Sequence, residues 1–394
     1  MKENNAAELM SMSAVLPPEP MNYSFLGPPC GPGEIGRIGD YRVLRLLGSG
    51  GMGAVFEAED TILHRSVALK VLRPELAVDQ ESRERFLREA QAAAAIGTEH
   101  VVTIYHVGEV AVVPYIAMEF LHGQTLQERL HRQAPLDLVT ALTVARQTAA
   151  GLAAAHEKGL IHRDIKPANL WMESDGPGGP FKRVRILDFG LARRLKGETS
   201  LTVTGFIVGT PNYMAPEQAS GYDIDHRADL FSLASVMYTM LTGELPFPGD
   251  SAMAVMMALA TKTPQAVIAK NPAIPPAASV LVSRLLAKDP ADRPQSARDV
   301  VAALDVILAT LPARMPTPPG GSPLPPATEQ VNSLETVCPT MIQPVAHDPQ
   351  PVPASEGDGV PTRPISPRAG IVLAVIGWLL AAGFGLHALW RILE

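Results

Sequence analysis

The chain has 394 residues, of which 46% are hydrophobic, and a formal net charge of −7. This length predicts one large or two modest domains with additional segments. The lack of a basic surplus argues against nucleic acid as an obligatory partner. Cys30 and Cys338, the two cysteines, lie outside any CxxC or CxxH spacing, so neither a disulfide framework nor a zinc site is expected and a reducing compartment is indicated.

Regular secondary structure is expected from Asp40 to Leu311. Residues 1–39 have little apolar periodicity, are rich in Pro, Gly and Asn, and are predicted to be disordered. From 41 to 120, short β-type runs alternate with one helical run, and from 121 to 311 the pattern is largely helical.

Two helices are predicted with defined roles. Residues 79–96 are predicted to form a helix with one apolar stripe, which contains Phe86, Ala90, Ala93 and Ile96. Residues 229–243 are apolar nearly all round, which predicts a central buried helix that ends at Gly243.

A glycine-rich stretch, LLGSGGMGAVFEAED, contains the GxGxxG spacing at Gly48, Gly50 and Gly53. Glycines let backbone N–H groups approach phosphate oxygens without interference from a Cβ. The AVFEAE that follows alternates like a strand, whereas a dinucleotide-binding fold begins a helix there. We therefore predict a hairpin tip that folds over a nucleotide; a plain structural hairpin is the alternative. The Walker pattern GxxxxGK[ST] is absent from the sequence.

Lys70 lies in the aliphatic run SVALKVL, where an edge-strand lysine is the simplest interpretation. The helix that follows favours another one. Glu89 lies three residues after Phe86 and four before Ala93, so it points along the apolar stripe. A carboxylate that faces the core needs a cation, and Lys70 is the expected partner.

In the segment LIHRDIKPANLWM, residues 160–172, apolar residues surround four charged or polar ones: Arg163, Asp164, Lys166 and Asn169. Buried charges must be paired or must bind a ligand. The segment matches H-R-D-x-x-x-x-N, and LDFG at residues 187–190 follows it between hydrophobic strands.

These motifs, with GTPNYMAPEQ and GSGGMGAVFEA, resemble the eukaryotic-like Ser/Thr protein kinases of bacteria over about residues 40–305. The resemblance implies an α+β, bilobal protein-kinase fold. A β-rich N-lobe with one main helix is expected at residues 40–121, and a mostly helical C-lobe at 122–311.

The resemblance also implies the chemistry of the site. Asp164 would accept the proton of the substrate hydroxyl, and Lys166 would neutralise the γ-phosphoryl group. Asn169 and Asp188 would hold Mg²⁺, or Mn²⁺, through oxygen ligands. Lys70, held by Glu89, would contact the α- and β-phosphates of ATP.

The expected ATP contacts lie in the glycine-rich loop, the strands under it and the segment that links the lobes. They are Leu47, Gly48, Ser49, Gly50, Gly51, Met52, Gly53, Val55, Ala68, Lys70, Glu89, Met118, Glu119, Leu121 and Trp171. Trp171 stands where the family usually has a smaller apolar residue, so it is expected to narrow the adenine pocket or to tilt aside.

Three further matches imply structural roles in the C-lobe. Glu217 is expected to pair with Arg293. Asp229 is expected to accept hydrogen bonds from the backbone of the catalytic loop, residues 162–169. The 12 residues from Met172 to Arg183 are long for this position and predict an extended surface hairpin.

Between the DFG and APE motifs, the resemblance implies a regulatory segment. Thr202 and Thr204 are expected to be autophosphorylated, and a phosphate there would pair with Arg163 and order the segment. Thr210 is expected beside the acceptor pocket. The alternative is a polar, mobile loop.

Residues 312–368 carry 15 of the 37 prolines and predict an extended linker. Residues 369–390 contain no formal charge over 22 positions, which predicts a transmembrane helix rather than a buried core helix. Arg363 and Arg368 precede this span and favour a cytoplasmic kinase domain on a single-pass membrane protein.

The sequence therefore predicts a membrane-anchored Ser/Thr protein kinase that uses ATP and magnesium and acts on protein substrates. The alternatives are a nucleotide-binding scaffold without phosphoryl transfer (a pseudokinase) and a small-molecule kinase. A homodimer is compatible with the sequence, whereas the physiological substrates and the activating signal are not encoded in it.

Overall fold

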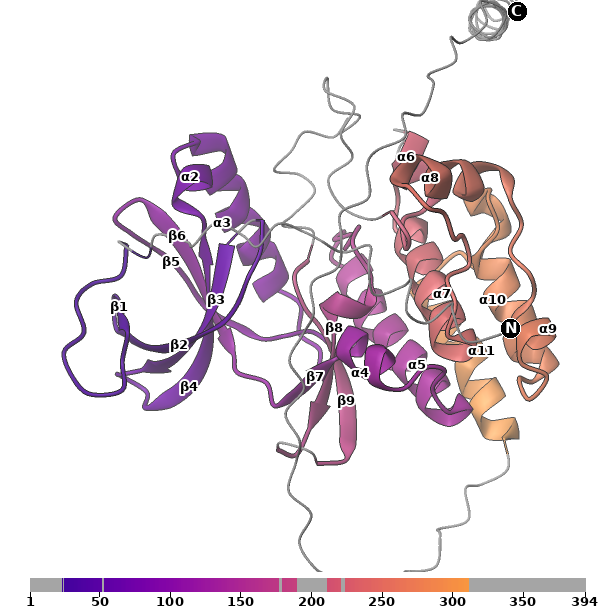
Figure 1. Ribbon diagram of the computed structural model, residues 1–394, viewed down its shortest axis with the longest axis horizontal. Coiled ribbons are helices and arrows are strands. Elements are labelled where there is room, and N and C mark those ends of the chain that lie inside the picture. Colours follow the sequence, from indigo (N-terminus) through magenta and orange to yellow (C-terminus); the bar gives the residue numbers. More distant parts are fainter. Residues whose placement is uncertain are drawn as a thin grey trace, which may run out of the picture. The chain divides into compact units, whose positions relative to one another are not determined.

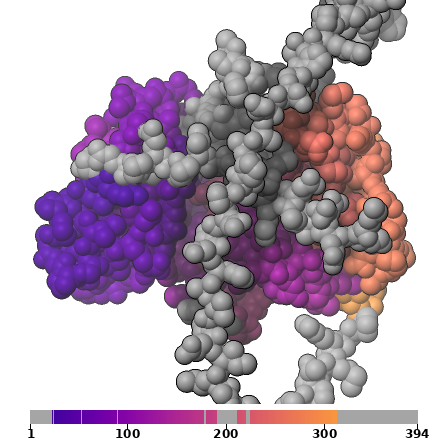
Figure 2. Space-filling view, in the orientation of Figure 1, coloured from indigo at the N-terminus to yellow at the C-terminus, as the bar shows by residue number. Residues whose placement is uncertain are grey.

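The structure is a computed structural model, and it describes Tyr23 and residues 25–51, 53–176, 179–189, 211–220 and 224–311. Within these ranges the chain folds into two lobes (Figure 1). Figure 2 shows the indigo surface of the N-lobe on one side of the coloured, two-lobed region and the orange surface of the C-lobe on the other. The predicted α+β, bilobal architecture is confirmed; the predicted membrane span lies outside the described residues.

The N-lobe is built on a six-stranded antiparallel sheet with the order β1-β2-β3-β4-β6-β5. Its strands are β1 (Gly36–Ile38), β2 (Tyr41–Ser49), β3 (Gly53–Asp60), β4 (Arg65–Leu72), β5 (Ile104–Val110) and β6 (Val113–Glu119). β2 and β3 form the predicted hairpin, and its glycine-rich tip comprises residues 47–51 and Gly53. β4 lies inside the sheet, between β3 and β6, so Lys70 is not on an edge strand.

Two helices follow β4 along the chain, α2 (Pro74–Ala77) and α3 (Gln80–Ala94). Asp79 caps α3 by accepting a hydrogen bond from the Ser82 N–H at 2.9 Å. The predicted apolar stripe of α3 is confirmed, because each of its four members is buried: Phe86, Ala90, Ala93 and Ile96. This stripe packs α3 against β5 and β6.

The C-lobe begins with a small antiparallel sheet in the order β7-β8-β9. Its strands are β7 (Gly123–Thr125), β8 (Leu170–Ser174) and β9 (Phe181–Ile186). β8 and β9 form the predicted extended hairpin. The helices are α4 (Leu126–Arg132), α5 (Leu138–His156), η1 (Pro167–Asn169), α6 (Pro216–Ser220), α7 (Arg227–Thr242), α8 (Ala252–Thr261), α9 (Val267–Lys270), α10 (Pro276–Leu285), η3 (Pro290–Asp292) and α11 (Ala297–Thr310).

Helix α7 lies at the centre of the C-lobe, as its sequence predicts. Residues 228–241 of α7 are all buried, and α5 and α10 pack against it. It ends at Gly243, whose φ of 76° lies in the left-handed region that favours glycine. Helix α7 is therefore a fully packed element of the C-lobe core.

The described N-terminal residues differ from the expected disorder. The Tyr23 and Phe25 rings pack edge-on against Phe56, with centroids 5.4 and 6.4 Å away. Glu34 accepts a hydrogen bond from the Gly31 N–H at 2.7 Å and pairs with Arg37 at 3.4 Å. These anchors follow no regular spacing, so the pattern of apolar residues does not reveal them.

Within the described ranges, α5 is the one helix long and apolar enough to cross a membrane. Half of its most apolar window is buried, and it packs against α7 and α11 in the C-lobe core. It is therefore a core helix of this lobe.

Candidate functional site

The register of the N-lobe sheet collects the expected nucleotide contacts on one face. Val55 pairs with Lys70 across β3 and β4, and Ala68 pairs with Met118 across β4 and β6. Residues that lie directly opposite one another in a sheet point to the same face. Val55, Ala68, Lys70 and Met118 therefore share the face that also meets α3.

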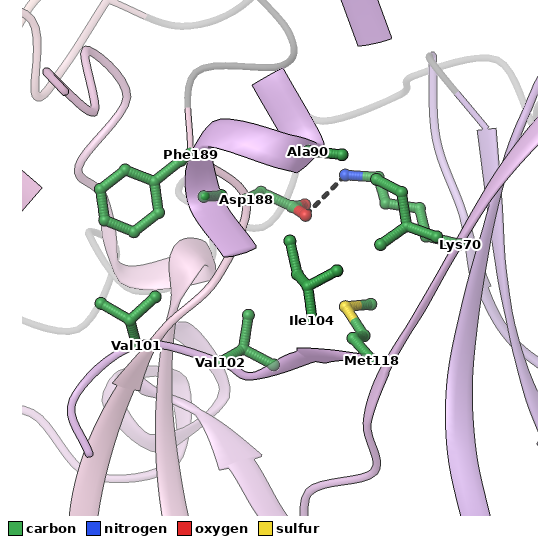
Figure 3. Close-up of a pocket in the computed structure, with 10 residues that line it drawn as sticks. Lys70, Ala90, Val101, Val102, Ile104, Met118, Asp188 and Phe189 are labelled. Atoms are coloured by element: carbon green, nitrogen blue, oxygen red, sulfur yellow. Dashed lines mark ion pairs between the residues drawn. The ribbon is translucent and has the colours of Figure 1, made fainter. Parts of the chain in front are cut away.

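Lys70 extends from this face to the C-lobe. Its Nζ lies 2.6 Å from Asp188 Oδ1, and the lysine side chain is 10% exposed (Figure 3). The pair lies in a pocket that is lined elsewhere by apolar residues, among them Met118, Ile104 and Phe189. A β4 lysine and the DFG aspartate thus meet across the two lobes.

Electrostatics keep Asp188 ionised. Burial by itself raises the pKa of this carboxyl, but the Lys70 ammonium overcomes that effect, with smaller help from His162 and Lys166. The pKa of Asp188 therefore lies below its ordinary value. The catalytic loop and the DFG motif lie next to one another, because the Leu187 N–H donates to the Asn169 carbonyl at 2.9 Å.

The catalytic loop brings Asp164, Lys166 and Asn169 into direct contact. Lys166 Nζ lies 2.7 Å from Asp164 Oδ2, and Asn169 Nδ2 donates to the same oxygen at 3.0 Å. Asn169 Nδ2 also donates to the Asp164 carbonyl at 2.8 Å. The carboxylate is held from two sides, so its direction is fixed before any substrate arrives.

Asp229 holds this loop from below. Its carboxylate is fully buried and accepts the backbone N–H groups of His162 at 2.8 Å and Arg163 at 2.7 Å. His156 on α5 contacts the same carboxylate through Nε2 at 2.8 Å. The expected hydrogen bonds from the loop backbone to Asp229 are thus present, and His156 is a partner that the sequence did not predict.

Two residues of the site adopt unusual backbone angles. Arg163 has φ 63° and Asp188 has φ 50°, a region that residues other than glycine seldom occupy. Such conformations persist when the surrounding contacts fix them. Here Asp229 and Gln218 fix Arg163, since Gln218 Nε2 donates to the Arg163 carbonyl at 2.8 Å.

The DFG phenylalanine joins the two motifs. Phe189 is buried, and its ring centroid lies 4.8 Å from that of His162 in the HRD motif. His162 Nε2 in turn lies 2.8 Å from the carbonyl oxygen of Leu187. The HRD and DFG segments are therefore one packed unit rather than two adjacent loops.

The glycine-rich tip has a mixed character. A Cβ added at Gly53 would lie 2.0 Å from the Val71 carbonyl oxygen, so packing itself requires glycine there. A Cβ at Gly48, Gly50 or Gly51 would meet no described atom within 4 Å. Leu47 and Ser49 are exposed beside them. Contacts among the described residues thus leave the glycines at these three positions unexplained.

The segment between the lobes carries Met118, Glu119 and Leu121. The Glu119 side chain pairs with Arg185 on β9, away from the face that carries Met118. Trp171 on β8 donates its indole N–H to the His122 carbonyl at 3.1 Å. This hydrogen bond connects the Trp171 indole to the backbone just after Leu121.

Glu217 and Arg293 form the expected ion pair. Arg293 is fully buried, and its two Nη atoms lie 2.6 and 2.8 Å from the Glu217 oxygens. The guanidinium also donates to the carbonyl oxygens of Ala287, Arg227 and Lys288. All of its donors are directed to acceptors, which is the condition for burying such a charge.

Several predicted site residues lie outside the description. Met52 and the threonines Thr202, Thr204 and Thr210 are not among the described residues. Glu89 lies in α3, but its side chain is not described, so the expected pair with Lys70 stays a prediction.

Asn169 and Asp188 are the residues expected to bind magnesium. Among the described residues, no three His, Cys, Asp or Glu side chains form a cluster that could bind a metal. Asp188 offers a carboxylate and Asn169 an amide oxygen, and their segments adjoin, since the Leu187 N–H donates to the Asn169 carbonyl at 2.9 Å. Magnesium accepts few protein ligands of this kind and completes its shell with water and phosphate oxygens. The two residues therefore fit a metal that arrives with a nucleotide.

A comparison with family models gives a match to the protein kinase domain over residues 41–303. The chain belongs to the protein kinase family. It is 38% identical to the serine/threonine-protein kinase PrkC of Bacillus subtilis over 67% of this chain and 40% of that protein. It is 39% identical to the serine/threonine-protein kinase pkn3 of Myxococcus xanthus over 68% of this chain and 50% of that protein. The chain thus matches half or less of the length of these relatives.

Solved structures give the same assignment. The kinase domain of Mycobacterium tuberculosis PknI matches with a TM-score of 0.54 and 30% identity, over 68% of this chain and 97% of that chain. The family match over residues 41–303 contains every described residue of the site.

Proposed function

We propose that this protein kinase family member is an active Ser/Thr protein kinase that transfers the γ-phosphate of ATP to protein hydroxyls. The observation that carries the proposal is the meeting of Lys70 with Asp188 next to the fixed Asp164–Lys166–Asn169 cluster. Phosphoryl transfer depends on positioning and charge stabilisation, and these residues supply both. Bacterial relatives that are named serine/threonine-protein kinases support the choice of acceptor.

The nucleotide would lie between the glycine-rich tip and β8. The backbone N–H groups of the tip would face the phosphates, and Lys70, steadied by Glu89, would contact them. Val55 and Ala68 would cover the adenine from above and Trp171 from below. Met118, Glu119 and Leu121 would border its edge.

Asn169 and Asp188 would hold magnesium, with manganese as a substitute. The metal would supply positive charge to the phosphate oxygens. Asp188 is suited to this role because its low pKa keeps the carboxylate ionised.

Asp164 would orient the acceptor hydroxyl and take its proton. Oδ2 is engaged by Lys166 and Asn169, so Oδ1 is the oxygen assigned to the incoming hydroxyl. Lys166 would then balance negative charge on the transferred group. A lysine two residues after the aspartate is typical of Ser/Thr kinases, so Ser and Thr are the proposed acceptors.

Regulation would come from the segment that precedes the APE motif. Phosphates on Thr202 and Thr204 would pair with Arg163, whose backbone is held by Asp229. Thr210 would border the acceptor pocket. Replacing both Thr202 and Thr204 with Ala should reduce turnover and abolish autophosphorylation peptides from this segment in mass spectrometry.

The protein would act at the cytoplasmic face of the cell membrane, anchored by residues 369–390 and spaced from it by the Pro-rich residues 312–368. Its partners would be protein substrates, and a homodimer is compatible with this arrangement. Membrane fractionation of the full chain, beside a chain that ends at residue 368, tests the anchor.

The decisive experiment is a transfer assay with radiolabelled ATP, magnesium and a generic protein substrate. The full chain should label Ser and Thr, chelation of the metal should stop labelling, and Asp164→Asn should remove it. If wild type and Asp164→Asn are equally inactive while both bind ATP, the scaffold alternative is correct. Labelling confined to a small molecule would identify a small-molecule kinase.

A further inference from the structure

A buried arginine connects the C-lobe to the segment between the lobes. Arg185 lies on β9 and is 3% exposed. Its Nη1 donates to the Glu99 carbonyl at 2.7 Å, and its Nη2 lies 3.5 Å from Thr103 Oγ1. The same Nη2 forms an ion pair with Glu119. One planar guanidinium thus contacts three points that precede or form the link between the lobes.

The backbone follows the same route. We name residues 99–103, between α3 and β5, the connector. Ile186 on β9 donates to the His100 carbonyl at 2.8 Å and accepts from the Val102 N–H at 3.0 Å. The Glu119 N–H donates to the Thr103 carbonyl at 2.9 Å. Hydrogen bonds therefore run from β9 through the connector to the end of β6.

Side chains alternate between the two faces along β6, which shows on which face the contact between Glu119 and Arg185 lies. Met118 lies on the sheet face that carries Lys70, so Glu119, the next residue, points to the opposite side. That side is where Arg185 lies. The side chain of Glu119 is therefore bound on the far side of β6, while Met118, the residue before it, lines the pocket that holds Lys70 and Asp188.

Stability alone is a weak reason for this pair. A buried ion pair is often no better for stability than apolar residues of the same volume. Arginine is, however, well suited to fixing several acceptors at once, because its donors form a rigid fork. Arg185 contacts the chain at Glu99 and Thr103 and the Glu119 carboxylate on β6, and its Nε lies 3.9 Å from Glu173 on β8, so it joins segments that share no single regular element.

We propose that Arg185 is a positioning residue for the nucleotide. It acts through Glu119 and fixes the position of the segment that links the lobes, residues 118–121, where the segment would contact ATP. This inference rests on the proposed kinase function. Arg185 itself touches neither the nucleotide nor the acceptor. Its loss should therefore act on ATP affinity more than on the chemical step.

The test uses the full chain and the variants Arg185→Met, Arg185→Lys and Glu119→Gln. Lys182→Met is the matched control, because Lys182 lies on the same strand and pairs with Asp175 at 2.9 Å in the hairpin. Arg185→Met and Glu119→Gln should each raise KM for ATP about three- to tenfold, the size of a modest coupling between sites. The kcat should stay within about twofold, and Arg185→Lys should recover part of the affinity.

The double variant of Arg185→Met and Glu119→Gln separates coupling from independent damage. A shared path predicts that the double variant is no worse than the more affected single variant. Unchanged KM in folded Arg185→Met and Glu119→Gln, or a loss of kcat at constant KM, overturns the proposal. If Arg185→Met does not fold, Glu119→Gln gives the decision from the other side of the pair.

Direct binding of a fluorescent ATP analogue keeps the two proposals apart. An inactive wild type whose affinity for the analogue still falls with Arg185→Met would refute the kinase function and retain the positioning role. An active wild type, with equal affinity for the analogue in all variants, would support the kinase function and refute the positioning role.

Discussion

The catalytic loop and the glycine-rich tip border the same proposed site but are held very differently. In the loop, His162 is fully buried, Asp229 binds two successive N–H groups, and Asn169 and Lys166 hold Asp164. In the tip, Leu47 is 40% exposed, and the 2.9 Å hydrogen bond from Arg73 to the Gly50 carbonyl is exposed to solvent. The loop is part of the core, whereas the tip has few packing contacts among the described residues.

This difference separates two tasks of a phosphoryl-transfer site. Groups that stabilise charge in the transition state are most effective when the fold orients them in advance. A cover over the phosphates must instead open and close, and elements that move have few buried contacts. Substitutions in the loop should therefore change chemistry or folding, and substitutions in the tip should change nucleotide affinity.

The largest effect is expected in the loop, at Asp164. Asp164→Asn keeps the size of the side chain but removes the proton acceptor, so transfer should fall about 10²- to 10⁴-fold. Affinity for ATP should change little. Initial rates and binding of an ATP analogue, measured on the same sample, check both statements. Asp175→Asn in the β8–β9 hairpin is the control and should behave like wild type.

The next effect is expected beneath the loop, at Asp229. In the wild type, the Asp229 carboxylate accepts the N–H groups of His162 and Arg163. In Asp229→Asn, an amide N–H₂ replaces one of the accepting oxygens, and the free energy of unfolding should fall by about 2–3 kcal/mol. The kcat should fall more than KM for ATP rises, because the loop loses its support. Denaturant unfolding and steady-state kinetics measure the two effects. Normal kcat in the variant would show that the loop keeps its shape without Asp229.

A smaller effect on stability is expected at Gly53, where the tip joins β3. Gly53→Ala would bring a Cβ to 2.0 Å from the Val71 carbonyl, so β3 and β4 must shift apart. Such overpacking should cost about 1–2 kcal/mol of unfolding free energy. Thermal unfolding checks this, and an unchanged midpoint would mean that the hairpin adjusts freely.

The difference between the regions also explains what the sequence predicted. The β2–β3 hairpin, the stripe of α3 and the buried α7 follow from periodicity, since each buries residues at a regular spacing. The members of the loop cluster follow from the HRD and DFG motifs and the family resemblance. These signals are local in the chain, and the distant pair of Glu217 and Arg293 was predicted through the family resemblance alone.

The contacts that were missed are non-local. Arg185 and Glu119 lie 66 positions apart, and His156 and Asp229 lie 73 apart. In the sequence, Arg185 is one basic residue in an alternating strand and His156 one residue at a helix end. Which distant group each meets is decided by the packing of β9 and α5, and no spacing in the chain encodes it.

The smallest effect on stability is expected at Gly50, and it provides the sharpest contrast with Gly53. A Cβ at Gly50 would meet no described atom within 4 Å, so Gly50→Ala should change the free energy of unfolding by no more than about 0.5 kcal/mol. The same Cβ would point into the space assigned to the phosphates and limit the approach of the backbone N–H groups. KM for ATP should therefore rise about three- to tenfold, equivalent to about 0.7–1.4 kcal/mol of binding. An unchanged KM would mean that the tip does not cover the nucleotide, and the contrast between loop and tip would then concern packing alone.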